Sequence, residues 1–287
     1  MRSLALLSFA LGLTVAADEP IEKPLGRVAI GTYEDRFSDA TGTWKGWSIS
    51  GEWFRDRFGP WSGSVTRSQR PEGTGTTFML AKEHGFGGNS WVWGGISSGT
   101  GADFLPQWRV DLDSNIDLGG PWGLAAGAAW SRFSDGYTMS MLQAGPSWTG
   151  EAWSASVRAQ RLQYGGGGGS DLGYFADLRW GAHNLRRWHN VRLAWGRGIF
   201  DSLQSGGAVA TGGTAAGTGS HSGQGRGRGG SAGTTLPGTE IPTEFLVSSA
   251  SHVPINRNFA LKAEVGWGKR DGQFNVWTGS LQFLCTF

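Results

Sequence analysis

The residues best suited to chemistry are the closely spaced carboxylates Asp111, Asp113 and Asp117, which follow Arg109. In an extended strand, side chains two residues apart share a face at a spacing of ~7 Å. That spacing could serve paired-carboxylate hydrolysis or hold a calcium ion. The sequence favours ion pairing instead, because unpaired charges in a confined interior are costly and basic residues occupy matching positions elsewhere in the chain.

Histidine is the other residue that could carry catalysis. The chain has His84, His183, His189, His221 and His252. A hydrolase would need one of them beside a Ser and an acid. We expect only His189 to lie on a strand, on its outward face, with the others at or near strand ends or in a low-complexity stretch. His183 and His189 are six residues apart with no Cys nearby, which does not favour a metal site. We predict no catalytic residue, no metal ligand and no cofactor.

Period-two alternation identifies the elements that position these residues. In the segment Gln107 to Leu118, apolar Trp108, Val110 and Leu112 alternate with charged and polar side chains. A typical soluble strand has about five or six residues, whereas a tilted membrane strand needs ~9–11. The charged side chains would then face a polar barrel interior. The predicted interior residues are Arg109, Asp111, Asp113, Asp117, Arg158, Asp177, Arg179, Arg192, Lys262 and Glu264.

Similar alternation recurs along the chain and predicts an all-β fold, a single antiparallel transmembrane β-barrel of about fourteen strands, within a range of 12–16. The predicted strands are 27–37, 43–55, 60–70, 75–84, 89–98, 106–118, 121–133, 136–145, 151–163, 170–181, 187–199, 241–252, 257–269 and 273–287. We expect Pro146 to mark a turn, because proline forfeits a ladder hydrogen bond. With both chain termini in the periplasm, short periplasmic turns should alternate with longer outer loops.

The last strand has the features of a membrane-insertion signal. Trp277, Leu281, Phe283 and Phe287 share one apolar face, and the chain ends on an aromatic residue. Chains inserted into the Gram-negative outer membrane commonly end this way. This pattern predicts the barrel-assembly machinery as a partner during insertion.

The other end of the chain predicts export. Residues 1–17 have the charged start, apolar run and small-residue cleavage site of a secretory signal. We expect a short periplasmic segment at 18–26 and the barrel at 27–287. No later apolar run reaches the ~18 residues of a transmembrane helix. The only cysteine, Cys285, excludes an intramolecular disulfide.

Composition narrows the classes further. The chain contains 50 Gly, 16 Trp and 15 Phe, and its formal net charge is only +2. Many Trp are typical of membrane-interface girdles, and the dispersed charge argues against a nucleic-acid partner. Residues 201–240 are mostly Gly, Ala, Ser and Thr and predict a disordered extracellular loop. Its two arginines could indicate RNA binding, but a solvated linker fits an exported loop better.

Three short motifs resemble a known family. They are Gly31-Thr32-Tyr33-Glu34-Asp35-Arg36-Phe37-Ser38-Asp39 followed by Trp44, then Phe104-Leu105-Pro106-Gln107-Trp108-Arg109, and then Gly127 to Phe133. Together they resemble the YaiO-type outer-membrane β-barrel family. The resemblance implies outer-membrane location and a single barrel, and that family has no well-defined activity to transfer. Longer relatives carry a helical-repeat region before the barrel, which this sequence lacks.

The sequence therefore predicts an outer-membrane protein that is a passive or gated conduit, or a surface scaffold, and not an enzyme. Outer-membrane lipid and lipopolysaccharide would surround it. Eight-stranded barrels are filled by side chains while 16–18 strands leave a channel, so small interior residues such as Ser154, Ser156 and Ala194 would favour an opening. The alternatives are an outer-membrane lipid or peptide hydrolase with a rim site and a non-transporting adhesin or assembly partner.

Overall fold

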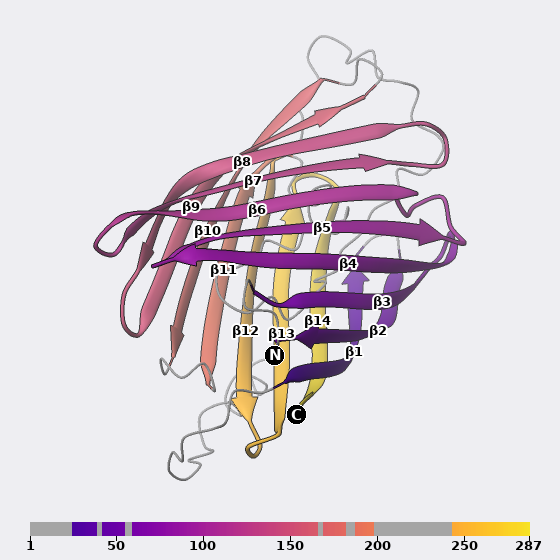
Figure 1. Cartoon of the computed structure of the whole chain (residues 1–287). Coiled ribbons are helices and arrows are strands. Elements are labelled where there is room, and N and C mark those ends of the chain that lie inside the picture. The colour runs from indigo at the N-terminus through magenta and orange to yellow at the C-terminus, as the bar shows by residue number, and fades with distance from the viewer. Residues whose placement is uncertain (1–24, 39–41, 55–58, 166–168, 182–186, 198–242) are drawn as a thin grey trace, which may run out of the picture.

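A computed structural model describes residues 25–38, 42–54, 59–165, 169–181, 187–197 and 243–287. These residues form a closed barrel in which every strand is antiparallel to its two neighbours (Figure 1). The strands are β1 Gly26–Phe37, β2 Thr43–Trp53, β3 Trp61–Arg70, β4 Gly73–Gly87, β5 Ser90–Thr100, β6 Trp108–Gly119, β7 Trp122–Arg132, β8 Thr138–Thr149, β9 Trp153–Tyr164, β10 Ser170–Gly181, β11 Trp188–Gly196, β12 Glu244–Pro254, β13 Phe259–Arg270 and β14 Phe274–Thr286. The predicted fourteen-stranded barrel is confirmed. Within the described residues, no helix has the length and apolar character needed to cross a membrane.

The first and last strands close the barrel. β1 pairs with β14 from Arg27 opposite Thr286 to Phe37 opposite Val276, and the Leu25 amide donates a 2.7 Å hydrogen bond to the Phe287 carbonyl. Closure leaves no strand edge, so each strand's backbone groups find partners in the wall, as a lipid environment requires.

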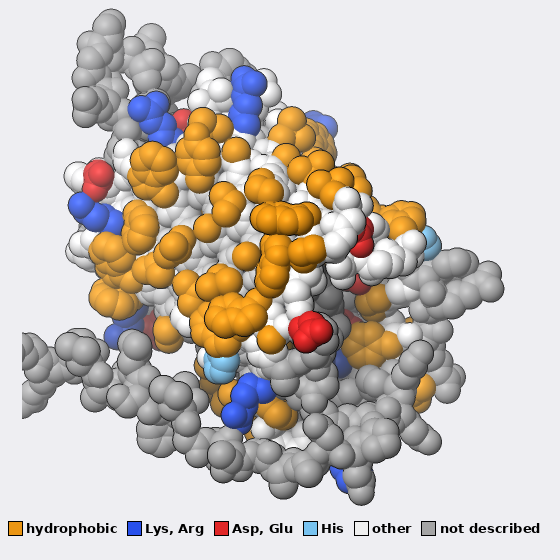
Figure 2. Space-filling model, turned by 90° about the vertical axis from the view of Figure 1, so that its left-hand side faces the viewer, with side chains coloured by type: hydrophobic (Ala, Val, Ile, Leu, Met, Phe, Trp, Pro, Cys, Tyr) orange, Lys and Arg blue, Asp and Glu red, His pale blue; other side chains and the backbone are white. Residues whose placement is uncertain are grey.

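The two faces of the wall differ as the alternation predicted. On β6, Trp108, Val110 and Leu112 are 53%, 48% and 51% exposed, whereas Arg109 and Asp113 are 2% and 3% exposed. Hydrophobic side chains spread over the middle of the wall in Figure 2, with Lys and Arg toward its edges. The barrel thus has an apolar outside and a polar inside, which is the arrangement of a transmembrane β-barrel.

The two ends of the barrel are defined here by their connections. At the turn end, β1 begins, β14 ends and β2, β4, β6, β8, β10 and β12 each run into the next strand; the opposite end is called the loop end. Exposed aromatic side chains lie near both ends. Trp53, Trp61, Trp122 and Trp153 lie at the turn end, and Trp130, Tyr174, Trp195 and Trp277 lie toward the loop end. Two such belts are typical of membrane interfaces.

The last strand presents its predicted apolar face outward. Trp277, Leu281, Phe283 and Phe287 are all at least 45% exposed. Leu284, which breaks the alternation, is 1% exposed and faces inward.

The prediction of a turn at Pro146 was wrong, because β8 continues to Thr149. Pro146 lies opposite Leu124 of β7, while the pairing with β9 passes from Ala144–Ala159 directly to Ser147–Ser156. The missing N–H therefore interrupts the ladder on one side only. Gly145 allows this, since a Cβ there would lie 1.9 Å from the Val157 carbonyl oxygen.

The connections differ less in length than predicted. Turn-end connections are short, but β3 and β4 at the loop end are also joined by only two residues, and β5 and β6 by residues 101–107. The long connection is the one between β11 and β12. Most of it, including residues 201–240, lies outside the described residues, as do residues 1–17 and most of 18–26. The predicted signal and disordered loop therefore stay predictions.

Candidate functional site in the barrel interior

The central interior contact is an ion pair between strands that are not neighbours. Arg158 on β9 donates from Nη1 to Oδ1 of Asp113 on β6 at 2.8 Å, and both side chains are 4% exposed. Gly127 on β7 lies between them in the wall, and a Cβ there would come within 3.0 Å of Asp113 Oδ1 and 2.7 Å of Gln143 Nε2. Absence of a side chain at Gly127 leaves the space in which Arg158 reaches its partner.

Two further interior ion pairs are more local. Arg192 and Asp177 face each other directly on β11 and β10, with Nε 2.8 Å from Oδ1. Arg109 binds Asp111 two residues along β6, with Nε 2.7 Å from Oδ2, and its Nη1 lies 3.3 Å from the Ser131 hydroxyl. Each pair offsets charge that the interior would otherwise leave desolvated.

A cationic group surrounds Trp188 nearer the turn end. The Arg179 guanidinium carbon lies 4.6 Å from the Trp188 ring centroid, and the Lys262 Nζ lies 5.5 Å from it. The His252 ring stacks on the same indole at 5.7 Å. Cations held against an aromatic face are stabilised by the ring quadrupole. The Trp188 ring therefore helps to stabilise the positive charges of Arg179 and Lys262 at the inner surface of the barrel.

The remaining predicted interior residues have different surroundings. Asp117 accepts hydrogen bonds from the backbone amides of Gly119 at 2.8 Å and Asn89 at 3.2 Å, so it organises the turns at the turn end. Glu264 lies close enough to Lys262 and Arg192 to interact with their charges. Asp111, Asp113 and Asp117 are thus engaged separately, and no cluster of three potential metal ligands occurs among the described residues.

An internal cavity of about 330 Å³ reaches from the central ion pairs to the turn end. Its polar lining includes Asn89, Ser147, Ser154, Ser156, Arg158 and Arg179. Ser154 and Ser156 thus line open space as the sequence suggested, whereas Ala194 is 1% exposed within an apolar cluster. The turn-end half of the interior is therefore an open vestibule with polar, charged and aromatic side chains in its lining.

The loop-end half is instead narrowed by the connection between β5 and β6. Leu105 in this loop is 7% exposed and occupies the space left by two glycines, since a Cβ on Gly75 or Gly99 would approach it to 2.5 or 2.6 Å. Neighbouring Phe104 lies 3.9 Å from the Arg70 guanidinium carbon, measured to the ring centroid. Residues 101–107 therefore pack inward against β3, β4 and β5.

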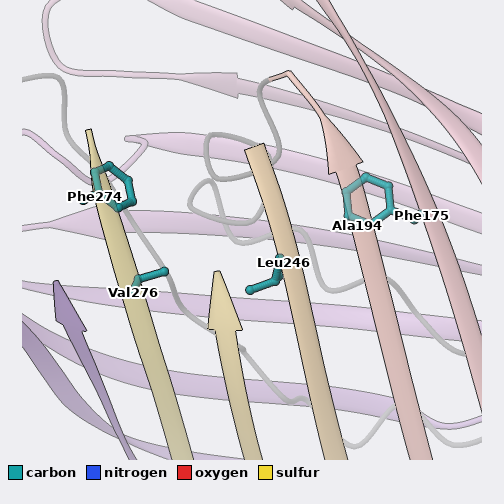
Figure 3. Packing of buried hydrophobic residues seen from close by; sticks show 5 residues of the cluster. All are labelled: Phe175, Ala194, Leu246, Phe274 and Val276. Atoms are coloured by element: carbon teal, nitrogen blue, oxygen red, sulfur yellow. The ribbon is translucent and has the colours of Figure 1, made fainter. Parts of the chain in front are cut away.

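Aromatic contacts continue from this loop around the wall. Arg70 lies 4.6 Å from the ring centroid of Trp44, Trp44 contacts Phe37 at 4.3 Å, and Phe37 contacts Phe274 at 5.3 Å. Phe274 belongs to an inward-facing apolar cluster on β10, β11, β12 and β14 (Figure 3). The cluster consists of Phe175, Ala194, Leu246, Phe274 and Val276.

A second apolar cluster faces inward from β7, β8 and β9. It contains Ala129, Met139, Met141 and Leu162, with Tyr164 packed against it. The loop-end collar, as the term is used below, consists of three parts. They are the two apolar clusters, the inward loop 101–107, and the contacts among Arg70, Trp44 and Phe37. The two buried apolar clusters thus lie toward the loop end, among buried charged residues such as Asp35, Arg70 and Glu244.

The histidines do not assemble a catalytic group in the described part of the chain. His189 Nδ1 lies 2.8 Å from the Ser251 hydroxyl, and its ring lies 5.6 Å from that of Trp180. No carboxylate of the described residues is within hydrogen-bonding distance of His189. The prediction that only His189 lies on a strand was wrong, because His84 is on β4 and His252 on β12. His183 and His221 lie outside the described residues.

Comparison with protein families identifies the barrel. The family model described as the YaiO membrane beta barrel domain matches residues 26–197. The chain belongs to the YaiO membrane β-barrel family. No curated protein sequence matches it.

Solved structures resemble this YaiO barrel in fold. The CymD monoaromatic hydrocarbon channel superposes with a TM-score of 0.56 and 7% identity, over 93% of this chain and 89% of that one. The outer membrane protein Omp33 of Acinetobacter baumannii gives 0.46 and 11% identity, over 92% of this chain and 100% of that one. The KdgM porin complex with oligogalacturonate gives 0.44 and 7% identity, over 89% and 98%.

The family motifs lie at the collar of this YaiO barrel. Tyr33, Asp35 and Phe37 face inward from β1, where the Tyr33 hydroxyl donates to the Ser68 hydroxyl at 2.8 Å. The inward position of Trp44 was not predicted, although it was readable: Trp44 is three residues from outward-facing Trp47 and must lie on the opposite face. The pairing of Asp113 with Arg158 had no comparable signal.

Proposed function

We propose that this YaiO barrel is an outer-membrane conduit for small polar solutes, with the vestibule as its path and the loop-end collar as its constriction. One observation carries the proposal: the interior holds an open cavity of about 330 Å³, with Arg158 and Arg179 in its lining, rather than being packed throughout. Its charges are held in pairs or against aromatic rings, so a solute meets an interior with both signs of charge. Charged and polar linings set selectivity in membrane pores.

The collar supports a gated rather than a permanently wide path. Apolar constrictions can close a pore by excluding water from a narrow segment. Here the constriction includes loop 101–107, which is held by Leu105 in a glycine-lined space and by Phe104 against Arg70. Movement of this loop would leave the β5–β6 pairs from Trp91–Asn115 to Ser97–Arg109 in place and would break the hydrogen bond from the Gly99 amide to the Pro106 carbonyl, so we propose that it is the moving part.

Membrane placement is part of the same proposal. The apolar outer wall between two aromatic belts suits a lipid bilayer, and the predicted export signal together with the aromatic face of the last strand favours the Gram-negative outer membrane. We place the turn end in the periplasm and the loop end outside. Insertion would then use the barrel-assembly machinery, with Trp277, Leu281, Phe283 and Phe287 presenting the recognised strand face.

Planar-bilayer conductance tests the conduit. We expect discrete current steps from refolded protein, and Arg179→Gln should shift selectivity toward cations because Arg179 lines the vestibule. Asp271→Asn is the matched control, since Asp271 lies in the β13–β14 connection. Silence from verified, folded protein, including a variant in which Leu105→Ser loosens the collar, would refute a conduit.

The rival function is an outer-membrane hydrolase, and the His189–Ser251 contact is the observation that favours it. We propose that this pair is structural, because it faces the lipid side and has no carboxylate partner among the described residues. Ester and peptide hydrolysis should therefore be absent in the wild type. Activity that disappears in Ser251→Ala would overturn this assignment.

A further inference from the structure

A groove of about 1040 Å³ lies on the outer wall near the loop end, across β1, β2, β3, β4, β13 and β14. Its floor is low because Gly279, between Glu34 and Val265, faces outward with open space where a Cβ would be, and because Thr32 and Ala263, which flank Leu281, are small. Apolar Trp47, Val265, Trp277 and Leu281 line its sides. Small residues therefore leave a hollow in the outer wall at this place.

Basic side chains gather at this groove. Arg36, Lys45 and Arg67 are exposed on the outward faces of three successive strands and line it together. Arg36 forms an ion pair with Glu34. No ion pair of the described residues engages Lys45 or Arg67. The groove therefore carries more positive than negative charge.

These charges are informative because they face the lipid side. An Arg or Lys on the outer wall is costly at the bilayer midplane and tolerated only near the interface. Lys45 opposes Glu34 and Gln69, and Arg67 opposes Trp47, so the basic side chains sit beside an interfacial aromatic residue. Arg36 opposes Trp277, so the basic side chains lie at the level of the loop-end aromatic belt, with apolar wall next to them.

We infer that this groove binds the phosphate groups of an outer-leaflet glycolipid. Arginine and lysine make charge-assisted hydrogen bonds to phosphate, and the Gly279 hollow gives an acyl chain a place beside Val265 and Leu281. The inference rests on the outer-membrane placement proposed above. It adds a specific binding site to a barrel that would otherwise contact lipid only through its apolar wall.

Native mass spectrometry of the refolded protein in detergent tests the inference. The probes are lipid A with both phosphates, dephosphorylated lipid A and inorganic phosphate. We expect wild-type protein to retain the phosphorylated lipid, and Lys45→Gln/Arg67→Gln to weaken binding about tenfold or more through lost charge-assisted bonds. Gly279→Leu should weaken it separately by filling the hollow. Arg132→Gln, which removes an exposed cation at the end of β7, is the control.

The outcomes separate the inference from its alternatives. Equal retention of both lipids, or equal loss in Arg132→Gln and the double variant, would overturn it. Displacement of lipid by inorganic phosphate would show a simple anion site and also overturn it. Conductance should be unchanged in the double variant because the groove is outside the barrel. A silent protein that still selects the phosphorylated lipid refutes the conduit alone, while a conducting protein without that selection refutes the groove alone.

Discussion

Removing the Asp113 carboxylate should destabilise the barrel far more than removing an exposed partner. Asp113→Asn leaves the Arg158 guanidinium, 4% exposed, without the carboxylate at 2.8 Å, and Arg158 Nε has no hydrogen-bond partner in the structure. Leaving a buried charge uncompensated reduces the free energy of unfolding by about 3–5 kcal/mol. We expect about 3 kcal/mol, since the nearby cavity can hydrate the group in part.

The matched control is Asp271→Asn, which breaks the exposed Lys269–Asp271 pair, whose side chains are 49% and 57% exposed. An exposed pair contributes about 0–1 kcal/mol. The assay is urea-induced unfolding in phospholipid vesicles, followed by tryptophan fluorescence. Arg158→Gln and the double variant Asp113→Asn/Arg158→Gln complete a mutant cycle. The double variant should lose less stability than the sum of the two single variants. Equal losses in Asp113→Asn and Asp271→Asn, or strict additivity in the cycle, would refute the reasoning.

Three further perturbations test the wall, the collar and the outer face. Gly145→Ala should lower the free energy of unfolding by more than 2 kcal/mol, roughly the scale of an overpacked core, because the new Cβ would meet the Val157 backbone. Gly279→Ala is the control in the same urea titration, and it should change the free energy of unfolding little because its Cβ would meet open space. Leu105→Ser should increase single-channel open probability if the inward loop closes the path, and an unchanged value would show that the loop is not the gate. Trp277 is 62% exposed and Trp44 is 1% exposed. Brominated phospholipids should therefore quench a smaller amount of tryptophan fluorescence in Trp277→Phe than in wild type. The amount quenched in Trp44→Phe should equal that in wild type.

The barrel was predictable because its strands are long and two-faced. From Gln107 to Leu118 the alternation alone separates lipid-facing Val110 and Leu112 from inward Arg109 and Asp113. The strand count followed because similar patterns recur between short turn signals. Pro146 was misjudged for a physical reason. Whether a strand tolerates proline depends on which neighbouring strand loses the hydrogen bond that the absent N–H would donate, and the periodicity of one segment does not contain that information.

The sequence predicts which charged side chains face the interior better than it predicts which of them form ion pairs with one another. Arg192 and Asp177 are directly opposite on consecutive strands. Arg158 and Asp113 belong to strands separated by two others, and their meeting depends on the stagger of the barrel and on the gap at Gly127. Stagger is a property of the closed sheet, so no spacing within one segment specifies it.

The three motifs that resemble the family contribute side chains to the loop-end collar, where packing is specific. An outward position needs only an apolar side chain of almost any shape, because lipid imposes no specific partner. An inward position must fit side chains from other strands, as Phe37 does between Trp44 and Phe274, and as Leu105 does in its glycine-lined space. A substitution inside the loop-end collar therefore disturbs more specific contacts than one on the outer wall. Substitutions in that collar should distinguish a gated conduit from a closed scaffold more sharply than substitutions on the outer wall.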